Sequence, residues 1–154
     1  MQKYSKLFFS IFITFFAFAI DQVSKSFVEK NINFFLSGFN VFDGLNLVYV
    51  QNKGVSFGLL SGLNITFILG IISLIVSGYI VFLIFKSQKI IELAGLSMIL
   101  GGALGNGVDR ISNLYVIDFI DIYYNNLHWP AFNFADSFIT VGAVIFFYYI
   151  LIKK

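Results

Sequence analysis

The sequence predicts a membrane protein of the all-α class with a small β element, organised as four transmembrane helices in a single domain over residues 1–154. Hydrophobic residues make up 58% of the chain and charged residues only 12%, with a mean hydropathy of +0.88. Such a chain has too little polar surface to cover a water-soluble globule. Its apolar segments place the four spans at residues 7–28, 59–85, 93–109 and 132–152, with extracytoplasmic segments at 31–58 and 111–131.

The first apolar segment has two interpretations. Residues 7–20 end in Ala17-Phe18-Ala19, which is typical of a secretory signal peptide with a cleavage site after small residues. The apolar pattern also continues through Val23, Phe27 and Val28, which gives the length of about 20 residues that an uncleaved span requires. The residues alone leave both interpretations open.

The next segment differs from the spans because turn signals divide it. Ser37-Gly38, Asp43-Gly44 and Asn52-Lys53-Gly54 bracket short apolar runs, which predicts a small β-sheet between the first and second spans. Its aromatic residues indicate a sheet that lies against the membrane surface. These residues are Phe34, Phe35, Phe39, Phe42 and Phe57. The alternative is a hydrophobic loop without chemistry.

The second span is nearly uninterrupted hydrocarbon, and the third is rich in small residues. Gly101 and Gly105 lie four residues apart, as do Gly102 and Asn106, a spacing that allows close helix packing. The Asn106 amide needs hydrogen-bond partners inside the membrane. The aromatic segment at 115–129 suits the membrane–water interface.

The lysines predict the orientation of the chain. One side of the four-span arrangement carries six lysines and a single acid, so the positive-inside rule places both termini in the cytoplasm. Those lysines are Lys3, Lys6, Lys86, Lys89, Lys153 and Lys154, and the acid is Glu92. Polar residues from separate segments of the chain then meet at the outer edge of the bilayer. They are Asp21, Asn52, Asp109, Arg110, Asp118 and Asp136.

This set of polar residues limits the chemistry. The chain has no cysteine and one histidine, which excludes a thiol nucleophile and makes a metal site improbable, and no basic run indicates nucleic acid. Paired carboxylates remain, because two aspartates that share a site cannot both ionise easily, and one can act as base on a shared water. Residue chemistry alone does not choose Asp118 over Asp109 or Asp121.

Two other function classes fit the same composition. A small transporter or proton-conducting protein would use intramembrane acids as a pathway, but here the acids gather at one edge of the bilayer. A non-enzymatic scaffold would use them as structural ion pairs.

Five motifs in order carry a resemblance that covers essentially the whole chain. They are Asp21-Gln22-x-x-Lys25, Asn52-x-Gly54, Gly101-Gly102-x-x-Gly105-Asn106-x-x-Asp109-Arg110, Val116-x-Asp118-Phe119 and Phe132-Asn133-x-Ala135-Asp136. The set resembles lipoprotein signal peptidase, or signal peptidase II, a bacterial family of intramembrane aspartyl proteases. One departure is Val55-Ser56-Phe57, where the family more often has alanines before the Phe.

The resemblance implies an endopeptidase of the bacterial cytoplasmic (inner) membrane, with its active site near the outer face. It would remove signal peptides from prolipoproteins by cutting before a diacylglyceryl-modified cysteine, would keep its first segment as an anchor, and would be sensitive to globomycin. It implies Asp118 and Asp136 as the catalytic pair. It also implies supporting or substrate-binding roles for Asn52, Gly54, Asn106, Arg110, Asn133, Asp21, Lys25 and Asp109. The expected partners are prolipoproteins and membrane lipid, with no metal or cofactor, no nucleic acid and a monomeric state.

Overall fold

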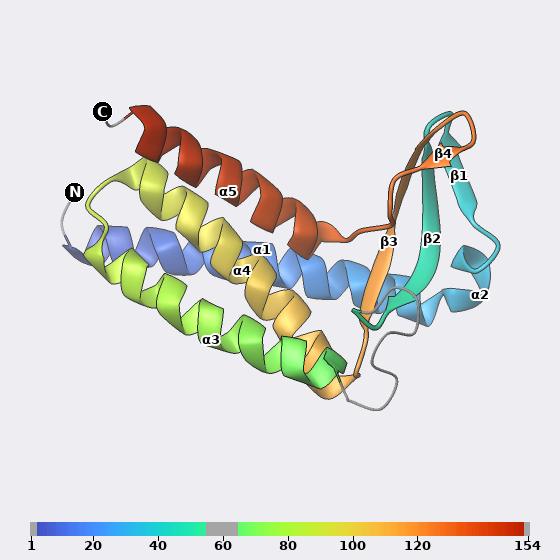
Figure 1. Ribbon diagram of the computed structural model, residues 1–154, viewed down its shortest axis with the longest axis horizontal. Helices are drawn as coiled ribbons and strands as arrows, with labels where there is room; N and C mark the ends of the chain where they lie inside the picture. Colours follow the sequence, from blue (N-terminus) through green and yellow to red (C-terminus); the bar gives the residue numbers. More distant parts are fainter. Residues whose placement is uncertain (1–2, 55–64, 153–154) are drawn as a thin grey trace.

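The computed structural model describes residues 3–54 and 65–152 (Figure 1). Four helices in this part of the chain are long and apolar enough to cross a membrane, as predicted. They are α1 (Lys3–Lys30), α3 (Ile65–Lys86), α4 (Ile90–Ser112) and α5 (Phe134–Ile152), with a short α2 (Ile32–Phe35) after α1. The expected start of the second span at residue 59 and the Val55-Ser56-Phe57 departure both lie outside the described residues.

Helix α4 is the centre of the bundle, since it packs against α1, α3 and α5. The most apolar stretch of α4 is 61% buried, against at most 22% for the other three helices. Small residues permit these approaches. A Cβ on Gly95 would lie 2.8 Å from the Gly142 carbonyl oxygen of α5, and a Cβ on Gly101 would lie 2.6 Å from the Thr14 carbonyl oxygen of α1. The glycines of α4 therefore set the distance between the helices.

A four-stranded antiparallel sheet stands at one end of the bundle, in the order β1-β2-β3-β4. The predicted sheet after the first span is present as β1 (Phe39–Phe42) and β2 (Leu45–Asn52). The sheet was expected only between the first and second spans, and the aromatic segment at 115–129 was expected only to suit the membrane–water interface. The segment forms β3 (Val116–Tyr124) and β4 (Leu127–His128), because its alternating, β-branched residues supply the partner strand that β2 needs.

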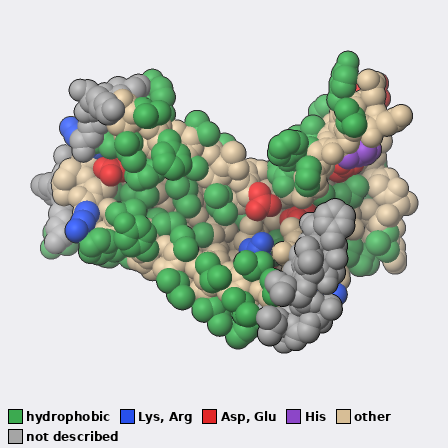
Figure 2. Space-filling model, in the orientation of Figure 1, with side chains coloured by type: hydrophobic (Ala, Val, Ile, Leu, Met, Phe, Trp, Pro, Cys, Tyr) green, Lys and Arg blue, Asp and Glu red, His purple; other side chains and the backbone are tan. Residues whose placement is uncertain are grey.

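One face of the sheet packs on the end of α1 and on α2. Val28, Phe35, Ile117 and Phe119 form a buried core there. Figure 2 shows a hollow between the helices and the sheet, with acidic side chains on its floor and hydrophobic side chains on its walls. In Figure 1, α1 begins and α5 ends at the opposite end of the bundle.

Substitution of Gly95 by Ala is predicted to destabilise the bundle by about 1–3 kcal/mol, because the new methyl group must push α4 and α5 apart. Gly78→Ala is the matched control, since a Cβ there meets nothing within 4 Å. Thermal unfolding in detergent should show a lower Tm for Gly95→Ala only. Equal Tm values for the two variants would contradict the packing described above.

Candidate active site

Asp136 is held at the start of α5 by a reciprocal cap with Asn133. The Asp136 N–H donates to Asn133 Oδ1 at 3.0 Å, and the Asn133 N–H donates to Asp136 Oδ2 at 3.2 Å. This is the capping-box arrangement of an N-cap residue and the third helical residue, here built from Asn and Asp. The other carboxylate oxygen, Asp136 Oδ1, accepts from Asn106 Nδ2 of α4 at 2.8 Å. Asp136 is thus oriented by both helices.

Asp118 lies on β3 and is only 2% exposed. Its Oδ2 accepts from Asn52 Nδ2 of the neighbouring strand β2 at 2.9 Å, and its Oδ1 accepts from Asn133 Nδ2 at 2.6 Å. Asn52 is itself oriented, because its Oδ1 accepts from the Gly54 N–H at 2.7 Å. Gly54 can make this turn because its φ is +75°, a backbone conformation that glycine adopts at no steric cost.

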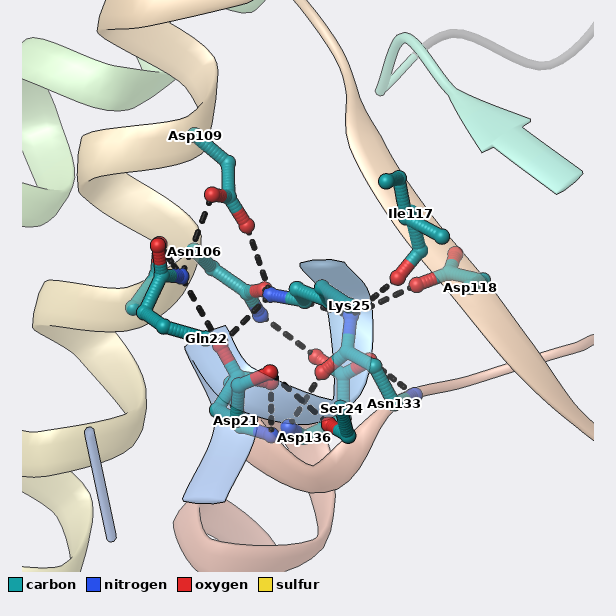
Figure 3. Close-up of polar contacts among 12 residues, drawn as sticks. Asp21, Gln22, Ser24, Lys25, Asn106, Asp109, Ile117, Asp118, Asn133 and Asp136 are labelled. Atoms are coloured by element: carbon teal, nitrogen blue, oxygen red, sulfur yellow. Dashed lines mark hydrogen bonds and ion pairs between the residues drawn. The ribbon is translucent and has the colours of Figure 1, made fainter. Parts of the chain in front are cut away.

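Asn133 joins the two acids into one site (Figure 3). Its side-chain amide donates to Asp118 while its side-chain oxygen and backbone N–H hold Asp136. Asn133 is fully buried, and its amide also lies 3.2 Å from Asn106 Oδ1. A strand and a helix from different parts of the fold therefore bring their aspartates to the same few side chains.

Burial raises the pKa of Asp118 to about 6, and the negative charge of Asp136 adds to the increase. The amides of Asn52 and Asn133 and the charge of Lys25 oppose the increase without cancelling it. A carboxyl group with this pKa exchanges its proton near neutral pH, as an acid–base catalyst requires.

A buried lysine supports this site from α1. Lys25 Nζ donates to Asp21 Oδ2 at 2.7 Å, to Asp109 Oδ2 at 2.7 Å and to Asn106 Oδ1 at 2.8 Å, so all three of its N–H groups are used. Lys25 is 3% exposed and Asp21 is fully buried. The Asp21–Lys25 pair is therefore a buried ion pair within α1, and Lys25 links it to Asp109 and Asn106 of α4.

Asp21 extends the support to α5. Its Oδ1 accepts from the Ala135 N–H at 2.8 Å, one residue before Asp136. Gly105 leaves the space for this carboxylate, since a Cβ there would lie 2.5 Å from Asp21 Oδ2. Sequence reasoning assigned no role to Gln22, whose side-chain amide reaches Asp109 Oδ1 at 3.1 Å. The position of Gln22 beside Asp21 in the sequence was the signal that could have indicated this contact.

Two residues considered from the sequence do not join the pair. Asp121 accepts from Asn46 Nδ2 at 3.0 Å and contacts His128 Nδ1 at 2.9 Å, across the sheet. Those contacts lower its pKa despite partial burial. Arg110 makes one side-chain hydrogen bond among the described residues, to the Asn106 carbonyl oxygen at 3.4 Å, and its buried Nε has no partner there.

The chain is similar to known proteins over most of its length. The family model described as signal peptidase (SPase) II matches residues 13–152. The chain belongs to the signal peptidase II family. A lipoprotein signal peptidase of Thermodesulfovibrio yellowstonii is 46% identical over 84% of this chain and 85% of the relative, and one of Aeromonas hydrophila is 38% identical over 84% and 80%. Two solved structures of a bacterial membrane enzyme, each 31% identical over 92% of this chain, superpose with TM-scores of 0.80 and 0.82 and cover 87% and 92% of those chains.

Membership of the signal peptidase II family identifies the chain as a peptidase that removes signal peptides from prolipoproteins. With its four membrane helices, it is a multi-pass protein of the bacterial inner membrane. The family assignment also decides against the transporter and scaffold alternatives.

Substitution of Lys25 by Met is predicted to destabilise the protein by about 3–5 kcal/mol, because it leaves Asp21 and Asp109 buried without their cation. Lys30→Met, at the exposed end of the same helix, should change stability by less than about 0.5 kcal/mol. Thermal unfolding of both variants in detergent measures the difference. Equal Tm values for Lys25→Met and the wild type would contradict the supporting role of Lys25.

Substitution of Asp118 by Asn is predicted to become more favourable to stability as the pH rises from about 4 to about 7. Folded Asp118 keeps its proton up to about pH 6, whereas an Asp in the unfolded chain loses it near 3.8. The folded wild type therefore binds more protons in this range and loses stability as the pH rises, while Asn does not titrate. The Tm of the variant minus the Tm of the wild type should rise across this range and then level off.

Asp121→Asn is the control for this titration. The pKa of Asp121 is lowered, so its contribution to stability is present above about pH 4 and is lost only in stronger acid. Its Tm relative to the wild type should therefore fall as the pH rises toward about 4, which is the opposite direction to the change predicted for Asp118→Asn. A flat difference for Asp118→Asn would show that this carboxyl group has an ordinary pKa.

Proposed function

We propose that this signal peptidase is an aspartyl endopeptidase in which Asp118 and Asp136 activate one water molecule. The peptide bond cut is the one immediately before the diacylglyceryl-modified cysteine of a prolipoprotein. The observation that carries the proposal is the joining of two aspartates from β3 and α5 through Asn133, with the pKa of one of them near 6.

The reaction begins with one proton shared by the two carboxyl groups. The ionised aspartate takes a proton from the water molecule while the water oxygen attacks the scissile carbonyl carbon. The protonated aspartate gives its proton to the carbonyl oxygen. Collapse of the tetrahedral diol breaks the C–N bond. The cysteine nitrogen receives a proton from the dyad, which leaves a free amino group on the lipoprotein and a carboxyl group on the signal peptide.

The neighbouring amides hold the dyad in place during these steps. Asn52 donates to Asp118 and Asn106 donates to Asp136, so each carboxylate keeps a neutral donor in both protonation states. These donors restrict rotation of the carboxyl groups, which keeps the reacting oxygens oriented toward a shared water.

The hollow between the sheet and the helices is the proposed place of the scissile bond (Figure 2). Val50 is paired with Asp118 across β2 and β3, Ile122 lies further along β3, and they expose 41% and 47% of their surface, which supplies an apolar wall for the lipid-bearing cysteine. The lysine distribution favours an orientation with this end of the bundle outside the cytoplasm, where exported prolipoproteins present their cleavage sites.

Substitution of Asp118 or Asp136 by Asn is predicted to lower turnover by at least about 100-fold, because Asn has nearly the shape of Asp but cannot act as the base. The measurement is cleavage of a diacylglyceryl-modified prolipoprotein in detergent, with folding checked by thermal unfolding. Asp121→Asn is the matched control, since Asp121 lies outside the dyad network, and it should cleave at a rate close to the wild type. Near-wild-type turnover in a folded Asp118→Asn or Asp136→Asn variant would refute the dyad and make Asp109 or Asp121 the next candidate.

A further inference from the structure

An apolar groove of about 640 Å³ runs along the bundle between α1 and α3, away from the aspartates. Helix α4 forms its floor with residues that include Leu104, while α1 contributes Leu7, Ile11 and Phe18, and α3 contributes Val81. Helices α1 and α3 have almost no direct contact with each other. Because the groove lies on membrane-spanning helices, a component of the bilayer must fill it.

The groove ends in a pocket of about 250 Å³ with a mixed polar and apolar lining, where α1 begins and α3 ends. The two share Leu7, Ile84 and Phe85, so they are continuous. Lys6 lines this mouth, and its Nζ donates to the Gln88 carbonyl oxygen at 3.0 Å and to Gln88 Oε1 at 2.7 Å.

The charge of Lys6 is not balanced within the part of the chain that the structure describes. No carboxylate there lies within 4.0 Å of its Nζ. Glu92, the acid at this end, accepts instead from Ser87 Oγ at 2.7 Å, and Lys86 lies over the Phe82 ring. One N–H of Lys6 and its positive charge therefore remain available to an anion at the mouth of the groove.

Ser10 adds a second polar group at the depth expected for a lipid ester. It lines the groove four residues beyond Lys6 on α1, about 6 Å deeper, and its buried Oγ has no hydrogen-bond partner among the described residues. A phospholipid carries its ester groups just below the phosphate, in the same order as these two side chains.

We propose that the groove binds an anionic phospholipid, with its phosphate against Lys6 and an acyl chain between α1 and α3. The apolar wall from Leu7 to Phe18 spans about 16 Å of helix. Among the described residues that line the groove beyond Ser10, Thr14 is the only polar one, and its Oγ1 already donates to the Ser97 carbonyl oxygen at 3.2 Å. The wall beyond Ser10 is therefore apolar and suits an acyl chain, while Lys6 and Ser10 suit the phosphate and the ester above it. The bound lipid bridges two helices that otherwise scarcely touch.

Native mass spectrometry of the delipidated full-length protein tests the head-group part of the proposal. The probes are phosphatidylglycerol, phosphatidylcholine and diacylglycerol with identical acyl chains. The wild type should retain one phosphatidylglycerol in preference to the other two lipids, and Lys6→Gln should reduce that retention about tenfold. Lys86→Gln removes the same charge at the same end of the bundle outside the groove, and it should leave retention unchanged.

A pair of tryptophan variants on α3 tests the acyl-chain part. Val81→Trp fills the groove and should abolish phosphatidylglycerol retention, whereas Ile75→Trp faces lipid elsewhere on the helix and should not. The wild type and Ile75→Trp should also gain Tm on addition of phosphatidylglycerol, and Val81→Trp should not. If Val81→Trp does not fold, Ile11→Trp fills the same groove from α1.

Several results would overturn the proposal. Equal losses of phosphatidylglycerol retention in Lys6→Gln and Lys86→Gln would mean that the lipid is attracted by positive charge in general. Retention of diacylglycerol equal to that of phosphatidylglycerol would mean that the head group is not recognised. Equal retention by Val81→Trp and Ile75→Trp would mean ordinary annular lipid. A dimer that Val81→Trp abolishes would assign the groove to a second copy of the chain.

Discussion

The structure depends on the satisfaction of one buried positive charge. A lysine ammonium inside a membrane protein is costly unless every N–H group has an acceptor and the charge has a counterion. Lys25 meets both conditions with Asp21, Asp109 and Asn106, and no water-facing alternative is open to a side chain that is 3% exposed. Because Asp21 also binds the backbone of α5, this contact fixes α1, α4 and α5 relative to one another.

The same constraint orients Asp136, one of the two proposed catalytic carboxyl groups, one step away. Lys25 donates a hydrogen bond to the side-chain oxygen of Asn106, so the amide nitrogen of Asn106 points to Asp136 and donates to it. In the same way, the Gly54 N–H donates to the side-chain oxygen of Asn52, so the side-chain nitrogen of Asn52 points to Asp118. Two asparagines with only one possible orientation thus hold two aspartates that must keep fixed positions during proton transfer.

The sequence predicted the parts of the fold that local pattern encodes. Long apolar runs identified four helices, and turn signals identified β1 and β2. Strand β3 was missed because aromatic residues after Tyr115 suggested an interface, and its pairing with β2 joins residues far apart in the chain. The motif order assigned the catalytic roles to Asp118 and Asp136 through a resemblance, whereas residue chemistry alone could not separate Asp118 from Asp109 and Asp121. That distinction depends on which acid is paired with Lys25, which with His128 and which with neither, and tertiary packing decides it.

The position of the site at the junction of sheet and bundle follows from backbone hydrogen bonding. A strand with an unpaired edge cannot lie in hydrocarbon, whereas a helix can, because all its backbone groups are paired internally. A dyad that takes one acid from a strand and one from a helix must therefore lie where the helices end and the sheet begins (Figure 1). That is also where water is available for hydrolysis and where a lipid-anchored cysteine would present the peptide bond before it. The fold thus places a reaction that consumes water at the edge of the apolar phase that holds its substrate.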